Sequence, residues 1–346
     1  MIWKHWPMDI SGNEGCTLTG ALSVTTEVAN SITLIHGPAG CAHHNVSLLQ
    51  AVHLARDRIS MPRIRSTDLK EEEIIFGGEN ALEEAIRETT RMGPDLICVL
   101  STCVTGTIGD DVGGVCGGDW GIPVLALENA GFLGGGFYSG SLQALISLAG
   151  LCNPAAGNGT VNLIGEKSLE YEVEEQYLET KRLLALMGVG VNIRFVRHTS
   201  LPEIRRMGEA SLNVLRDPGI SALGSHLQAR LSIPYLDSFP VGMEGTLRFL
   251  EKAGDYLDLD SSRAIKTERT HQRKILSKFS QLKGKRIRLD PSLLAPNDRE
   301  GAFELLDALD MALDPQGFRV PVPDPFPVGT SGLLRLLHRW RRFAHA

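Results

Sequence analysis

The sequence predicts an α/β protein with parallel sheets, because short apolar runs alternate with segments of helical periodicity along most of its 346 residues. Two of these runs, residues 31–35 and 96–100, are apolar enough to be buried strands, and each leads through a turn into another segment. The alternation starts again after a linker of small residues at 154–159. A chain of this length is expected to fold into two or three domains. We therefore expect units at residues 1–155, 160–255 and 256–346.

The composition argues against two classes of partner. A net charge of −6 and a pI near 6.0 provide no basic field for nucleic acid. The longest apolar runs are far shorter than a membrane span. The first residues also lack the apolar segment and cleavage site of a secretory signal, so we expect a cytoplasmic, reducing location.

All six cysteines lie in the first half of the chain, and none forms a C-x-x-C pair. This spacing argues against a zinc ribbon, a thioredoxin motif and a ferredoxin-type run. In a reducing compartment the thiols should be free or metal-bound, and any ligands would have to converge from separate loops. The six are Cys16, Cys41, Cys98, Cys103, Cys116 and Cys152.

Cys41 follows the strand at residues 31–35 through a Gly-Pro-Ala-Gly turn and begins a predicted helix over residues 41–52. At a helix start, the positive end of the dipole and the free backbone N–H groups favour a thiolate and any anionic cluster bound to it. The alternative interpretation is a buried structural cysteine beside an ordinary turn.

Two more cysteines have similar positions. Cys16 lies on a loop ahead of a helix predicted at residues 21–29, and Cys103 lies just past the end of the strand at 96–100, where open parallel sheets bind their ligands. In contrast, we expect Cys98, Cys116 and Cys152 to be packed in the core.

The other elements continue the α/β alternation. A loop at residues 131–140 contains five glycines, and an acidic run at 71–73 is expected to be a solvated face. The predicted strands are 123–127, 161–165, 191–196 and 284–289, and the predicted helices are 80–92, 141–151, 169–187, 202–215, 222–231, 247–253 and 261–281.

The third unit is short and becomes proline-rich at residues 321–327, so it is expected to be a truncated α/β unit. Its last segment, residues 333–343, interleaves leucine and tryptophan with four arginines. This pattern predicts a basic amphipathic helix, which either packs on its own unit or docks to a partner.

Taken together, three sequence blocks carry a family resemblance. They contain Cys16, Cys41 and Cys103, which are separated by 25 (41 − 16) and 62 (103 − 41) positions. Gly15-Cys16, residues 35–41 (IHGPAGC) and residues 101–111 (STCVTGTIGDD) resemble the cluster-ligand motifs of the nitrogenase component 1 family. The spacing and the last block are most similar to the scaffold subunit of iron–molybdenum cofactor assembly. Residues 239–246 look more like the dark-operative protochlorophyllide reductase subunits.

The resemblance implies stacked Rossmann-like domains and a pair of related subunits, as a homodimer or a heterodimer. It also implies an iron–sulfur cluster, 4Fe-4S or a related type, at the subunit interface, held on this side by Cys16, Cys41 and Cys103. A separate ATP-hydrolysing iron protein would supply electrons. The sequence agrees with this division, because it contains no G-x-x-x-x-G-K-[ST] loop.

The chain departs from nitrogenase proper in its second unit. No cysteine follows Cys152, and Asp217 or Pro218 lies about where the cofactor-anchoring thiol would be. We assign none of the available histidines, His198, His226 and His271, as its replacement.

Three hypotheses about function follow from this departure. The leading one is a nitrogenase-like oxidoreductase that passes electrons to a bound substrate, such as a tetrapyrrole, with residues 131–140 and 239–246 as pocket walls. The second is a non-catalytic scaffold for assembly of a metallocluster. The third is a related chain that no longer binds iron.

Overall fold

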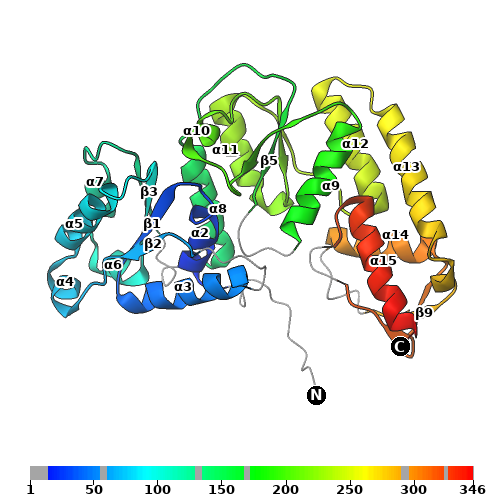
Figure 1. Cartoon of the computed structure of the whole chain (residues 1–346), viewed down its shortest axis with the longest axis horizontal. Coiled ribbons are helices and arrows are strands. Elements are labelled where there is room, and N and C mark those ends of the chain that lie inside the picture. The colour runs from blue at the N-terminus through cyan, green and yellow to red at the C-terminus, as the bar shows by residue number, and fades with distance from the viewer. Residues whose placement is uncertain are drawn as a thin grey trace.

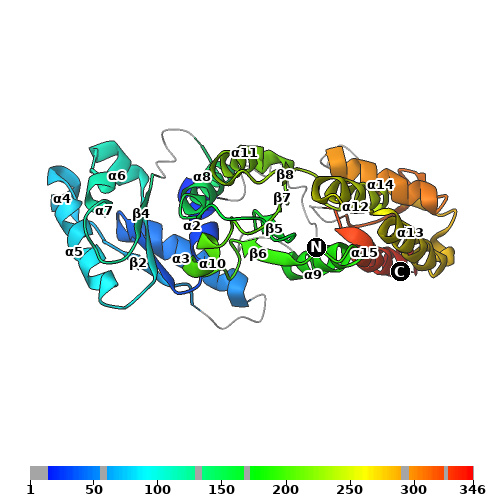
Figure 2. The same cartoon turned by 90° about the horizontal axis from the view of Figure 1, so that it is seen from above.

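The computed structural model describes residues 15–54, 61–128, 135–166, 172–289, 296–322 and 326–345. Three sheets lie in a row along the long axis of the molecule (Figure 1), and the view from above shows the same order (Figure 2). Every strand pair in these sheets is parallel. The predicted fold class, α/β with parallel sheets, is therefore confirmed.

The first sheet has the strand order β2-β1-β3-β4, and its two central strands are buried along their whole length. Its helices form two layers, in which α2, α3 and α8 share one hydrophobic core and α5 and α7 share the other. The strands are β1 (Ser31–His36), β2 (Ile64–Ser66), β3 (Leu96–Ser101) and β4 (Val124–Leu127), and the helices are α2 (Thr17–Thr25), α3 (Ala39–Leu54), α4 (Glu71–Phe76), α5 (Glu79–Thr90), α6 (Cys103–Ile108), α7 (Val112–Cys116) and α8 (Phe137–Ala149).

Two glycines allow α2 and α8 to touch backbone to backbone. A Cβ on Gly20 would lie 1.8 Å from the Phe137 carbonyl oxygen, and a Cβ on Gly140 would lie 1.9 Å from the Thr17 carbonyl oxygen. Real atoms cannot approach so closely, so only glycine fits at either position. This contact fixes the helix that follows Cys16.

The second sheet has the order β6-β5-β7-β8, and its central strand β7 was wrongly predicted as part of a helix at residues 202–215. The helix ends at Arg205, and the strand begins at Leu212. A buried apolar run of four residues cannot be told from a buried helix by periodicity alone. The strands are β5 (Val161–Ile164), β6 (Val191–Phe195), β7 (Leu212–Leu215) and β8 (Tyr235–Leu236), and the helices are α9 (Val173–Ala185), α10 (Leu201–Arg205), α11 (Ser221–Leu231) and α12 (Met243–Leu257).

The third sheet, β10-β9-β11, is much smaller, with strands of two or three residues. The helix α15 buries Trp340 completely in the core of this unit, and Arg335 and Arg339 pair with Glu172 at 3.0 and 2.9 Å. The C-terminal helix thus packs on its own unit, as one of the two interpretations predicted, and it also packs against α9 of the second unit, to which Glu172 is adjacent. The elements are α13 (Ser262–Ser277), β9 (Arg286–Arg288), α14 (Pro296–Ala308), β10 (Ala312–Leu313), β11 (Phe318–Arg319) and α15 (Gly329–His345).

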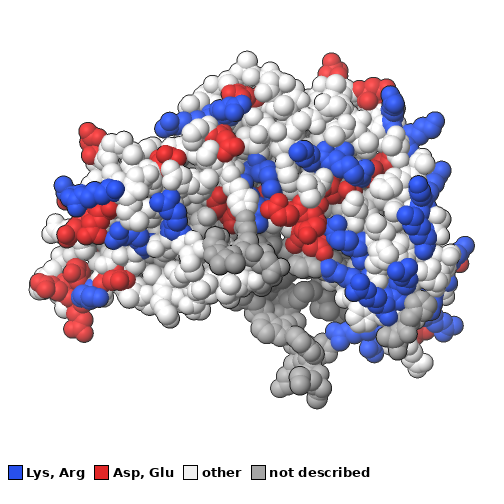
Figure 3. Space-filling model, in the orientation of Figure 1, with Lys and Arg blue, Asp and Glu red and all other residues white. Residues whose placement is uncertain are grey.

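Charge is unevenly distributed over the surface. Figure 3 shows Lys and Arg side chains gathered over the end that carries α13 and α15, and Arg263, Lys266 and Lys274 of α13 are exposed. Within the described ranges, no helix has the length and apolar character needed to cross a membrane.

The replacement Gly140→Ala is expected to lower the free energy of unfolding by about 3 kcal/mol or more. The added methyl group would collide with a backbone oxygen of α2, which cannot turn aside as a side chain can. Urea denaturation measures the free energy of unfolding. The control is Gly245→Ala in α12, where the nearest atom lies 3.9 Å away and the free energy of unfolding should rise by about 0.5–1 kcal/mol. Equal stabilities of the two variants would contradict the helix contact.

Candidate functional site

Each of the three predicted ligand cysteines lies at the start of a helix. Cys16 is the N-cap of α2, with extended backbone, Cys41 is in the first turn of α3, and Cys103 is the first residue of α6. The helix α2 begins at Thr17, earlier than the predicted residue 21, so Cys16 caps it directly instead of lying on a preceding loop. The free N–H groups of all three helix starts can face a bound anion.

The pairing of β1 with β3 brings Cys41 and Cys103 to the same edge of the sheet. The last residues of the two strands, His36 and Ser101, are directly paired. The following residues are also in contact, because a Cβ on Gly37 would lie 2.3 Å from Thr102 Oγ1. The Thr102 N–H donates to the His36 carbonyl at 3.2 Å, which holds the two turns together.

The helix that follows Cys16 is held to the helix that carries Cys41 by a buried hydrogen bond. Thr19 Oγ1 donates to Asn45 Oδ1 at 2.7 Å, and Asn45 Nδ2 donates to the Cys41 carbonyl at 2.8 Å. The sequence could not predict the hydrogen bond between Thr19 and Asn45, because the two residues are 26 positions apart and belong to no local motif.

The three thiols lie close enough to influence one another. Burial raises the pKa of Cys41 above its ordinary value of 9.0, and the neighbouring thiols Cys16 and Cys103 raise it further. All three cysteines are free, with Cys16 exposed and the other two partly exposed. The structure therefore brings together all three residues singled out from the sequence.

The remaining cysteines are packed, as predicted. Cys98, Cys116 and Cys152 are at most 5% exposed, and burial raises the pKa of each to about 12. Cys152 also directs its S–H toward Met207 Sδ, 3.2 Å away. Such thiols remain protonated at physiological pH and are poor ligands.

A buried pair, His36 and Asp110, was missed in the sequence although both residues lie in the blocks that contain the cysteines. His36 Nε2 lies 2.9 Å from Asp110 Oδ2, and both side chains are at most 2% exposed. Burial lowers the pKa of His36 in spite of the carboxylate, so the ring is neutral at pH 7 and donates its Nε2–H. Asp110 Oδ1 accepts from Gly78 N at 2.9 Å. The pair thus connects the end of β1 to the segment after α6 and to the start of α5.

The donor set fits an iron–sulfur cluster. Three thiolates are the soft ligands that such clusters use. The Thr102 side chain, next to Cys103, is buried against Gly37 and so belongs to the packing of the two turns that precede Cys41 and Cys103. Across the described ranges, no set of three or more His, Cys, Asp or Glu side chains is arranged to hold a single metal ion.

The second sheet does not fit a thiolate-anchored cofactor. After β7, Asp217 accepts a hydrogen bond from Gly219 N at 2.8 Å and caps the turn Pro218–Ile220. The whole sequence has no cysteine beyond Cys152. Of the predicted pocket walls, Phe239 is 9% exposed beneath the Arg216 guanidinium, whereas residues 131–134 lie outside the described residues.

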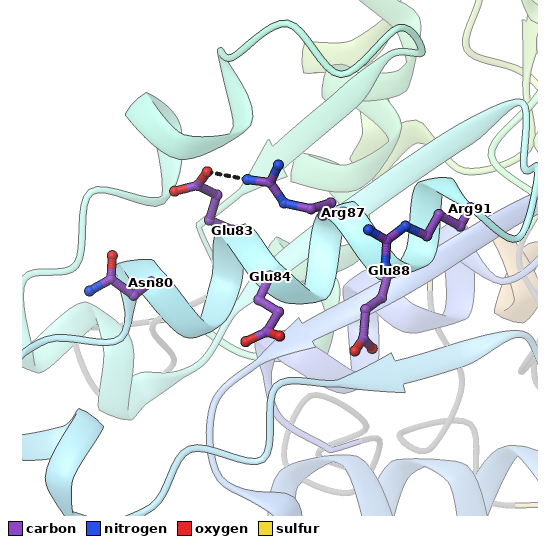
Figure 4. Close-up of a pocket in the computed structure, with 6 residues that line it drawn as sticks. All are labelled: Asn80, Glu83, Glu84, Arg87, Glu88 and Arg91. Atoms are coloured by element: carbon purple, nitrogen blue, oxygen red, sulfur yellow. Dashed lines mark hydrogen bonds and ion pairs between the residues drawn. The ribbon is translucent and has the colours of Figure 1, made fainter.

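A shallow depression on α5 is a solvated charged face (Figure 4). Its lining side chains come from this one helix and from its C-cap residue Arg91, and Glu83 pairs with Arg87 at 2.6 Å. Such i,i+4 pairs contribute only tenths of a kcal/mol, and nothing here converges on a ligand. Of the acidic run at residues 71–73, Glu71 and Glu72 are exposed as predicted, whereas Glu73 is half-buried and accepts the Lys70 N–H at 2.7 Å.

Comparisons with known proteins agree with the geometry. The model of the family "Nitrogenase component 1 type Oxidoreductase" matches residues 16–290. The nitrogenase iron-molybdenum cofactor biosynthesis protein NifE of Clostridium pasteurianum is 31% identical over 253 residues, which are 70% of this chain and 53% of that protein. The nitrogenase molybdenum-iron protein alpha chain of Methanococcus maripaludis is 27% identical over 300 residues, which are 79% of this chain and 62% of that protein.

Solved structures show the same fold. The structure "Nitrogenase Cp1 at pH 6.5" superimposes with a TM-score of 0.66 and 22% identity, over 90% of this chain and 62% of that chain. This chain thus spans between 53% and 62% of the length of the relatives described above.

In the protein without a cluster, Cys41 is expected to react faster with iodoacetamide once Cys16 and Cys103 are both replaced by Ser. The two neighbouring thiols raise the pKa of Cys41, so their removal lowers it and increases the thiolate fraction at a fixed pH near 9.0. Mass spectrometry of the Cys41 peptide measures the rate. Cys116→Ala serves as the control and should leave the rate unchanged. An unchanged rate in the double variant would show that the thiols are not close.

Proposed function

We propose that this chain, which belongs to the nitrogenase component 1 type oxidoreductases, holds an iron–sulfur cluster through Cys16, Cys41 and Cys103 and acts as a scaffold for metallocluster assembly. The observation that carries the proposal is the convergence of three free thiols at three helix starts. The scaffold role is favoured because relatives from three organisms are named as cofactor biosynthesis proteins.

When bound, the cluster supplies an electron-transfer centre and a group that can be passed on. The residues of this chain would hold the cluster and fix its position. Cys16, Cys41 and Cys103, at the starts of α2, α3 and α6, would hold the cluster as thiolates, and iron binding would have to outweigh the burial and the neighbouring thiols that raise the pKa of Cys41. The His36–Asp110 pair and the Thr19–Asn45 pair hold these starts in fixed relative positions.

The cluster face is also proposed as a subunit interface. A cubane cluster has four irons, so three thiolates leave one ligand short, and a second copy or a related subunit can supply it. Cys16 is exposed, as a ligand shared across an interface has to be before the subunits meet.

An ATP-hydrolysing iron protein is proposed to dock beside the same edge, at an exposed apolar pair on α4. Ile75 and Phe76 are 71% and 83% exposed, which is unusual for large apolar side chains in adjacent positions. The helix α4 packs against α6, whose first residue is Cys103. A donor bound there would lie close to the cluster, and electron transfer requires this proximity.

Anaerobic reconstitution with iron and sulfide tests the ligand assignment. Cys16→Ala, Cys41→Ala and Cys103→Ala should each lose most of the visible absorption of the cluster, whereas Cys98→Ala and Cys152→Ala should retain it. Light scattering on the same samples should show a dimer for the loaded protein. An intact spectrum in Cys41→Ala, or a monomer that carries a full cluster, would contradict the proposal.

A second candidate function is reduction of an organic substrate, such as a tetrapyrrole. The observation that favours it is Asp217 in place of a cofactor thiol, which leaves the second sheet edge without a metal anchor. Incubation with an iron protein, ATP and reductant separates the two functions. A scaffold should release metal to an acceptor protein without turnover, whereas repeated reduction of an added tetrapyrrole would favour the enzyme.

Phe76→Ala is expected to weaken binding of the iron protein by about 2 kcal/mol, roughly thirtyfold in Kd, because a buried aromatic anchor is lost from the interface. Cluster content should remain at the wild-type level, since Phe76 is 83% exposed and is not one of the proposed ligands. Titration by light scattering or calorimetry measures the affinity. The control is Met92→Ala, which removes another exposed apolar side chain, 53% accessible, in the turn after the C-terminal end of α5. Equal affinity in the two variants would place the docking surface elsewhere.

A further inference from the structure

A small pocket lies where the units of the first and second sheets meet. It is lined by the turn from α2 to β1, the end of α3, the segment that leads into β2, and the turn after β6, and its volume is about 200 Å³. At this place the Ala29 N–H donates to the Thr199 carbonyl at 3.0 Å. The pocket therefore lies at a direct contact between the two units.

This pocket is separate from the cluster site. Cys16 and Cys41 lie at the starts of α2 and α3. Thr26 and His53, which line the pocket, lie at the other ends of the same two helices. Along α3, the 12 positions (53 − 41) from Cys41 to His53 correspond to roughly 18 Å. A molecule bound in the pocket is thus a second ligand and not a part of the cluster.

Glu27 brings a buried carboxylate to the lining. It is 5% exposed, and its Oε2 accepts no hydrogen bond from the described residues. Arg197 Nη1 and His198 Nδ1 approach this oxygen only to 3.6 and 3.9 Å, which is too far for a hydrogen bond. Because a buried carboxylate oxygen without a donor is unfavourable, a ligand with an ammonium group would be stabilised here.

Arg63 brings the opposite charge to the same lining. It is exposed, and one guanidinium N–H donates to Asn30 Oδ1 at 2.9 Å. Its guanidinium makes no other hydrogen bond or ion pair to a described residue. A guanidinium has five N–H donors in a fork that matches a carboxylate, so Arg63 can bind one. Val28, Met61 and Pro62 add apolar surface to the lining.

We propose that this pocket binds a small zwitterion of the amino acid type, whose ammonium group donates to Glu27 and whose carboxylate accepts from Arg63. The volume lies below the range of about 300–1,000 Å³ that is typical of ligand pockets, so the ligand is small. His198 belongs to the second unit and the other lining residues to the first, so a bound ligand should stabilise the contact between the units. The inference is independent of the proposed function.

Thermal unfolding of the full chain in the presence of each standard amino acid tests the proposal. At least one amino acid should raise Tm, and calorimetry should then show that one molecule binds per chain. Analogues of that amino acid which lack either charged group should bind about tenfold more weakly or worse. For alanine these analogues are propionate and ethylamine.

Arg63→Gln tests the carboxylate contact. Because Arg63 is exposed, this variant should fold normally and bind the amino acid about tenfold more weakly, whereas the amine analogue should bind it as well as it binds the wild type. The matched control is Arg65→Gln, because Arg65 pairs with Glu88 at 2.8 Å, outside the pocket, and its loss should leave the affinity unchanged.

Glu27→Gln tests the ammonium contact, and should weaken binding of the amino acid but not of the analogue without the amino group. Three results would each overturn the inference. The first is that no amino acid raises Tm or binds. The second is that Arg63→Gln and Arg65→Gln bind the amino acid equally well. The third is that the amino acid binds no more tightly than its analogues, a comparison which needs only the wild-type chain.

Discussion

The register between β1 and β3 determines where the site forms. The two strands pair from Ser31 with Leu96 to His36 with Ser101, so they end together at one edge of the sheet. A shift by one residue would turn each buried side chain to the other face and would separate the turns that follow. The observed register brings Gly37 into contact with Thr102, and Cys103 follows Thr102 directly, whereas Cys41 follows Gly37 after the short Pro-Ala-Gly turn. Two of the three thiols are thus placed by backbone pairing alone.

The third thiol reaches the same edge by a different route. Cys16 precedes a helix, and α2 is fixed by close packing against α8 at Gly20 and Gly140 and by the Thr19–Asn45 hydrogen bond to α3. Helix packing therefore positions Cys16, whereas strand pairing positions Cys41 and Cys103. Cys16, the N-cap of α2, lies outside the sheet and is exposed, whereas Cys41 and Cys103 are partly buried.

Burial separates the ligand candidates from the structural cysteines more sharply than sequence position does. Cys98 and Cys103 are five residues apart, yet Cys98 lies in the middle of β3 with a pKa of about 12, and Cys103 is partly exposed at a helix start. This distinction could be predicted, because strand periodicity and helix starts are local properties of the sequence. The hydrogen-bonded side chains that hold the site together could not be predicted from the sequence. His36 and Asp110 are 74 positions apart, and only the tertiary fold brings them together. The strand β7 was missed for a related reason, since its burial by flanking strands is also a tertiary property.

The two larger sheets share a topology but present different chemistry at their carboxyl edges. The first edge offers thiols and helix starts. The second carries paired charges, because Glu166 lies 2.8 Å from Arg194, and Glu174 lies 2.7 Å from Arg197.

These ion pairs also constrain what the second edge can bind. Burial alone would raise the pKa of Glu174, but Arg194 and Arg197 lower it to about 2, so its charge persists at any physiological pH. Arg194 and Arg197 are mostly buried and each already faces carboxylates, and removing the partner of a buried cation is unfavourable. A polyanionic metallocluster at the second edge would have to displace these carboxylates without a thiolate to anchor it. The proposal of a single cluster-binding edge in this chain, at the first sheet, therefore depends on the ion pairs of the second sheet as well as on the cysteines of the first.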